Sequence, residues 1–123
     1  MQTIIYRIKG PPIAIVKNQR GQRKCMDYFN RNLLDYQRQL ANQHNDNPLL
    51  TGAWALDIHF LFEKSLQNHK EHTQSPTITQ LMRFVDEVTR GIIFDNECII
   101  NDIRAHKDYS QAFPETTLIF NRK

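Results

Sequence analysis

The chain has 123 residues, a length that suits one folded domain with a modest hydrophobic core. Hydrophobic residues make up 40% of the sequence and charged residues 24%, with a formal net charge of +3. No apolar run approaches the roughly 18 residues that a membrane span needs, and residues 1–7 lack the charged-then-apolar plan of a secretion signal. We therefore expect a single soluble, cytoplasmic domain over residues 1–123, and its two cysteines are too few for a disulfide framework.

The first elements are a strand and a basic loop. Residues 3–9 alternate and are rich in isoleucine, which predicts a strand that Gly10 and the two prolines after it end. An exposed loop is predicted for residues 17–24. Positive charges gather in this loop and in the segment that follows, with two acidic residues among them: Lys17, Arg20, Arg23, Lys24, Arg31 and Arg38. Such a loop is suited to bind phosphates, and the alternative is a solvated loop that only keeps the protein soluble.

A helix and a strand follow. Apolar residues recur at intervals of three and four from Met26 to about Asn42, which predicts a helix with one buried stripe, and residues 44–48 form a polar loop. Residues 54–62 alternate, which predicts a strand with its apolar side chains on one face. Asp57 and His59 share the other face, a geometry compatible with metal binding or proton transfer and equally with an ordinary half-solvated strand.

Residues 64–74 are predicted to form a loop, in which the H-x-x-H spacing of His69 and His72 is a weak zinc signal. A second helix follows, with Ser75 as its cap, Pro76 at its first position and Gly91 as its stop. One buried face is predicted for it, made of Ile78, Leu81, Met82, Val85 and Val88.

The rest of the chain is predicted to be β-structure. Residues 94–97 form a polar turn, 98–107 a strand, 112–115 a turn and 116–120 a last strand. The predicted order is β-α-β-α-β-β, with about four strands and two helices in one α+β domain.

The segment from Pro76 to Lys107 resembles the core motif of the RusA family of Holliday-junction resolvases. The family pattern is P-D-x-D-N-L-x-K-x-x-x-D-x-(L)-x-G, followed by an aromatic residue, an Asp pair and a strand that ends in lysine. The matching positions are Pro76, Leu81, Arg83, Glu87, Gly91, Phe94 and Lys107, with Asn96 and Glu97 at the Asp pair. The upstream order of strand, glycine, proline and basic loop fits as well, so the resemblance covers nearly the whole chain.

The chain departs from this pattern at the metal ligands. Thr77 and Thr79 stand where the family has two metal-binding aspartates, and Glu97 keeps a carboxylate at an expected ligand position. A hydroxyl cannot replace the negative charge that holds Mg²⁺. Two threonines at a helix N-terminus favour holding a phosphate over holding a cation, and their alternative role is simple helix capping.

The resemblance implies a RusA-like homodimer that binds branched DNA, such as Holliday junctions, in recombination and repair. We expect nuclease activity to be weakened or lost. DNA contacts are expected from Lys17, Arg20, Arg23, Lys24, Thr77, Thr79 and Lys107, with Arg83 gripping a phosphate near the site of cleavage. One alternative is an active Mg²⁺-dependent endonuclease in which Glu97 is joined by Asp95, Glu87 or Asp57. The other alternative is a protein-binding adaptor that has kept the fold.

Overall fold

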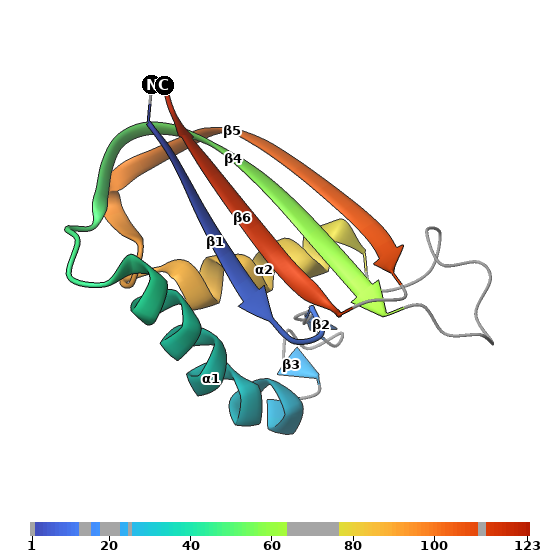
Figure 1. Ribbon diagram of the computed structural model, residues 1–123. Coiled ribbons are helices and arrows are strands. Elements are labelled where there is room, and N and C mark those ends of the chain that lie inside the picture. The colour runs from blue at the N-terminus through green and yellow to red at the C-terminus, as the bar shows by residue number, and fades with distance from the viewer. Residues whose placement is uncertain (1, 13–15, 18–22, 25, 64–76, 111–112) are drawn as a thin grey trace.

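The computed structural model describes residues 2–12, 16–17, 23–24, 26–63, 77–110 and 113–123, and for residues 16–17, 23–24, 26–32 and 110 it describes the backbone. These residues form a four-stranded mixed sheet, a two-stranded pair and two helices that lie on one face of the larger sheet (Figure 1). The predicted α+β class and the order β-α-β-α-β-β of the major elements are confirmed. Neither helix in the described ranges is long and apolar enough to cross a membrane.

Most element boundaries are close to the predicted ones. The elements are β1 (Thr3–Lys9), β2 (Val16–Lys17), β3 (Arg23–Lys24), α1 (Met26–His44), β4 (Leu50–Glu63), α2 (Ile78–Thr89), β5 (Phe94–Ser110) and β6 (Glu115–Arg122). The prediction of a polar turn at residues 94–97 was wrong, because these residues already belong to β5. Phe94 pairs there with Leu50 of β4, so a neighbouring strand supplies the backbone partners that the local sequence does not reveal.

The larger sheet has the strand order β1-β6-β4-β5. β6 is antiparallel to both β1 and β4, whereas β4 and β5 are parallel. A parallel pair needs a long crossover, and α2 provides it in the manner of a β-α-β unit. The pairing of β4 with β5 shifts register between Trp54 and Ala55.

The core lies between the sheet and the two helices. Alternate residues of β1, β4 and β6 face the helices and are buried, as the period of two predicts: Tyr6, Ile8, Trp54, Leu56, Ile58, Phe60, Leu118 and Phe120. The buried face of α2 is rotated from the predicted one, because Phe84 is buried while Ile78 is 37% exposed and Met82 is half-buried. Phe84 packs edge-on against Tyr36 of α1 with ring centres 5.4 Å apart, so the contact with α1 explains the rotation.

Helix α1 covers the outer edge of β1 through two glutamines. Gln43 accepts a hydrogen bond from the N–H of Arg7 at 2.7 Å and donates one to its carbonyl at 2.6 Å. Gln39 does the same at Lys9, with distances of 2.6 and 2.9 Å. These amides satisfy edge groups that would otherwise be open to pairing with another strand.

Candidate functional site

Three strands of the larger sheet have their C-terminal residues at the same end of the sheet. Lys9 of β1 pairs with Glu115 of β6, Glu115 pairs with Leu61 of β4, and Leu61 pairs with Asp108 of β5. Because β6 runs opposite to the other three strands, this row marks the carboxyl ends of β1, β4 and β5 together. We call it the carboxyl end of the sheet. Sheets that contain parallel strands commonly bind ligands at such an end.

Helix α2 begins near the carboxyl end and runs away from it (Figure 1). Met82 lines the same groove as Ile103 in the middle of β5, whereas Arg90 bridges to Phe94 at the start of that strand. The helix is therefore antiparallel to β5, and its first turn lies beyond Met82 toward the carboxyl end. The unpaired N–H groups of that turn carry the positive end of the helix dipole.

Thr77 is the N-cap residue of α2. Its hydroxyl oxygen accepts a hydrogen bond from the N–H of Gln80 at 3.3 Å, and its own N–H donates to the Gln80 side chain at 3.0 Å. The prediction of Ser75 as the cap was wrong, since the helix starts two residues later, and both Ser75 and Pro76 lie outside the described residues. A reciprocal capping box needs Glu or Gln three residues on, and Ser75 has Ile78 there.

The capping role leads to a stability prediction. Thr77→Ala is expected to lower the free energy of unfolding by about 1 kcal/mol, because the Gln80 N–H loses its acceptor. Thr79→Ala is the matched control: Thr79 is exposed and its loss is expected to change stability by less than about 0.5 kcal/mol. Urea denaturation of both variants measures the difference. Equal losses would show that the box does not stabilise the helix.

The predicted basic loop contains a short antiparallel pair, in which Lys17 of β2 pairs with Arg23 of β3, next to Lys24. The prediction of a loop throughout was wrong for these strand residues, and Arg20 lies outside the described ones. β2 begins four residues after Pro12, so the chain between them spans at most about 14 Å. The pair therefore stays close to the end of β1, below the carboxyl end in Figure 1.

Lys107 of β5 lies next to Asp108 at the carboxyl end. It is in register with Phe60 and its side chain lies on the helix side of the sheet, with the ammonium nitrogen 5.9 Å from the centre of the Phe62 ring. Partial burial lowers the pKa of Lys107, because removing an ammonium group from water disfavours its charged form. Arg83 is exposed on α2, one residue after Met82.

Glu97 lies at the other end of the sheet. It precedes Cys98, which pairs with Gly52 near the start of β4. Between this end and Thr77 runs α2, whose 12 residues give it a length of about 18 Å. Within one chain, the structure therefore brings Thr77 and Thr79 to the same end as Lys107 and does not bring Glu97 to them.

The predicted companions of Glu97 in a metal site are Asp95, Glu87 and Asp57. Among the described residues, no group of three or more His, Cys, Asp or Glu side chains could hold a metal ion. Asp57, one of the three companions, pairs with Arg104 and Ile119 along the middle strands. Mg²⁺ requires near-octahedral coordination by oxygen atoms, usually with one or two carboxylates and several waters. The Mg²⁺ site that the resemblance implies therefore stays a prediction.

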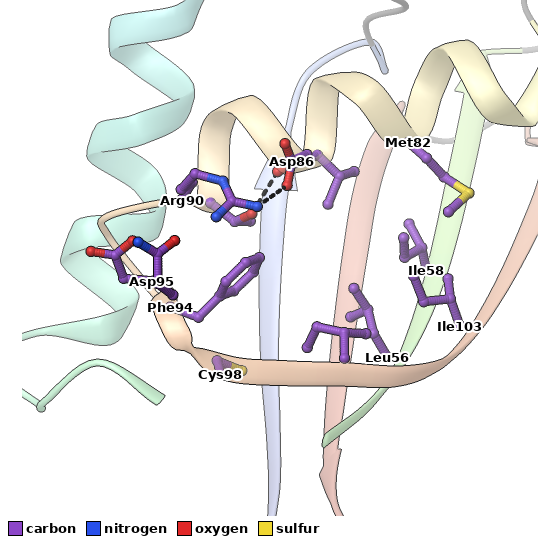
Figure 2. Close-up of a pocket in the computed structure, with 13 residues that line it drawn as sticks. Leu56, Ile58, Met82, Asp86, Arg90, Phe94, Asp95, Cys98 and Ile103 are labelled. Carbon is purple, nitrogen blue, oxygen red and sulfur yellow. Dashed lines mark hydrogen bonds and ion pairs between the residues drawn. The ribbon is translucent and has the colours of Figure 1, made fainter. Parts of the chain in front are cut away.

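A groove that sequence patterns did not reveal runs between α2 and β5, with a volume of about 370 Å³ (Figure 2). Its walls are mainly apolar, and Asp86 and Arg90 form an ion pair of 2.8 Å on its helix side. The hydrogen bond to Asp86 raises the pKa of Arg90, and the guanidinium carbon lies 5.7 Å from the centre of the Phe94 ring. Partial burial also raises the pKa of the Cys98 thiol, because removing a thiolate from water disfavours its charged form. The i, i+4 spacing of Asp86 and Arg90 is the sequence signal for the ion pair.

A comparison of the sequence with known protein families finds no match, and a search of curated proteins finds none either.

Proposed function

We propose that the protein binds branched DNA through the carboxyl end of its sheet, in the manner that its resemblance to the RusA family implies. One observation carries the proposal. Three separate parts of the chain converge on this end, and each brings a positive charge or the positive end of a helix dipole. They are the β2–β3 pair with Lys17, Arg23 and Lys24, the first turn of α2, and Lys107 of β5. Lys9 ends β1 on the same row.

These groups suit a phosphate backbone better than a base edge. Each lysine or arginine near a phosphate releases a condensed counterion, and a helix N-terminus offers N–H donors to an anion. Glu115 and Asp108 lie on the same row and are negatively charged, so the positive potential is confined to the segments that flank the row. Binding would therefore follow the shape of the junction, with little reading of base sequence.

Weak or absent cleavage is part of the proposal. Hydroxyl groups at Thr77 and Thr79 supply no charge to hold a cation, and Glu97 stands at the far end of α2 from them. We further propose a homodimer, whose two-fold symmetry would match a four-way junction, and a role in recombination or repair in the cytoplasm.

The DNA-binding proposal is tested by fluorescence anisotropy with a labelled synthetic four-way junction. A variant with Lys17, Arg20, Arg23 and Lys24 all replaced by alanine is expected to bind at least tenfold more weakly at about 0.1 M salt. The slope of log K against log salt should also become shallower by about 0.9 for each lost phosphate contact.

The matched control is the double variant Arg104→Ala/Lys123→Ala, which removes exposed cations away from the carboxyl end. It is expected to bind like the wild type. Equal weakening in both variants would place the contacts elsewhere, and no binding by the wild type would favour the adaptor.

Cleavage is tested on the same junction with Mg²⁺, comparing the wild type with Glu97→Gln. We expect little nicking from either protein. Robust metal-dependent nicking that disappears in the variant would show that a working endonuclease uses Glu97.

A further inference from the structure

Two histidines lie side by side on the open face of the larger sheet, opposite to the buried core residues. This is the face that the helices do not cover (Figure 1). His59 of β4 and His106 of β5 are direct partners in the parallel register. Both side chains are exposed. They come from positions 47 residues apart in the sequence, so no local spacing indicates that they meet.

The separation of the two ring centres is one that two imidazoles bound to one metal ion can have. Their centres are 5.1 Å apart and their planes are inclined by 46°. A Zn²⁺ ion about 2.0–2.1 Å from one nitrogen of each ring stands about 3.2 Å from each ring centre, which separates the centres by about 5.2 Å at a tetrahedral angle. A right angle at the metal would bring the centres to about 4.5 Å. The observed separation is close to the tetrahedral value.

The surroundings leave the rings available as ligands. Within the described part of the chain, neither ring makes a hydrogen bond. The pair borders a hollow of about 390 Å³, which has room for water molecules to complete the coordination of an ion. The charged groups on this face are Asp57 and Arg104 on one side of the pair, Asp108 and Glu115 on the other, and Arg7 and Lys9 farther away on β1. The three carboxylates lie on the strands of the pair or on the strand beside them, whereas two of the three cations lie on β1, so the field close to the rings is attractive to a cation.

We propose that His59 and His106 form a site for a divalent transition metal of the Zn²⁺ class, with water as the remaining ligands. Imidazole nitrogens select zinc, copper or nickel, whereas Mg²⁺ prefers oxygen. Two protein ligands make the site weaker than a structural zinc site with four. The bound ion would join β5, the edge strand, to β4. The site is independent of the proposed DNA contacts and of any Mg²⁺ used in cleavage.

Calorimetric titration of the full chain with Zn²⁺ alone tests the site. Wild type is expected to bind one ion, and His59→Gln and His106→Gln are each expected to weaken that binding at least tenfold. Co²⁺ in place of Zn²⁺ should give the strong visible absorption of tetrahedral coordination in the wild type and lose it in both variants. Thermal unfolding with Zn²⁺ should show a higher Tm for the wild type only, since an ion that binds the folded state stabilises it.

The matched control is His69→Gln/His72→Gln, which removes the other histidine pair that the sequence suggests for zinc. Retained binding in this variant supports the proposal. Loss of binding there, a loss in only one of the two single variants, or no difference among all the proteins would overturn it.

Discussion

Replacing Phe84 by alanine is expected to lower the free energy of unfolding by about 3–5 kcal/mol. Phe84 is 1% exposed and is packed edge-on against Tyr36, so it joins α2 to α1 over the sheet. Truncation leaves a cavity between the two helices and removes an aromatic contact worth about 0.5–1.5 kcal/mol beyond its buried area. Because α2 carries its capped first turn to the carboxyl end, loosening this helix also disturbs the proposed DNA interface.

Urea denaturation of Phe84→Ala, Phe84→Leu and Arg83→Ala measures this effect. The leucine variant keeps most of the apolar volume and is expected to lose less than half as much stability as the alanine variant. Arg83 is the exposed neighbour on the same helix turn, so its truncation should change stability by less than about 0.5 kcal/mol. A loss at Phe84 no larger than that at Arg83 would mean that the two helices do not pack as described.

Gly10→Ala is expected to cost about 2–4 kcal/mol of stability, from backbone strain and a steric clash together. Gly10 has a φ of 122°, a conformation that residues with a side chain rarely adopt. A Cβ atom there would lie 2.9 Å from both Cε1 and the hydroxyl oxygen of Tyr36. That ring is fixed, since its hydroxyl donates to the carbonyl of Pro11 at 3.1 Å and its other side meets Phe84.

Gly91→Ala separates the two causes. Gly91 has a φ of 84°, but nothing lies within 4 Å of the Cβ that alanine would add. Strain alone is therefore expected there, at about 1–2 kcal/mol. Thermal or urea unfolding measures both variants. Equal losses of stability would show that the Tyr36 ring moves to accommodate the added methyl group. A larger loss for Gly10→Ala shows that the close approach of the helix to the strand end is rigid.

Local sequence patterns predicted the elements well where each element carries its own signals. The strand at residues 3–9 was predicted at its observed bounds because it alternates and ends at a Gly-Pro pair. The sequence also predicted that α2 ends before Gly91, since a residue of positive φ after a helix is usually glycine.

The errors fall where a distant segment decides the outcome. Residues 94–97 are polar and resemble a turn, yet pairing with the start of β4 draws them into β5. Which face of α2 is buried depended on Tyr36 of another helix. The cap of α2 is the exception, because Thr77 and Gln80 are three residues apart and their capping box is a local signal. Glu97 and Thr77 belong to one sequence motif, but a helix between two parallel strands holds them at opposite ends.

By itself, the sequence determined the class of the domain, the order of its elements and the side of β4 that is buried. These follow from periodicity and turn chemistry, which act between residues a few positions apart. Only the tertiary structure decided that the β2–β3 pair, the first turn of α2 and Lys107 share one end of the sheet, and that His59 meets His106 on its open face. The physical reason is that strand pairing joins segments many residues apart, and its register depends on the packing of the whole core.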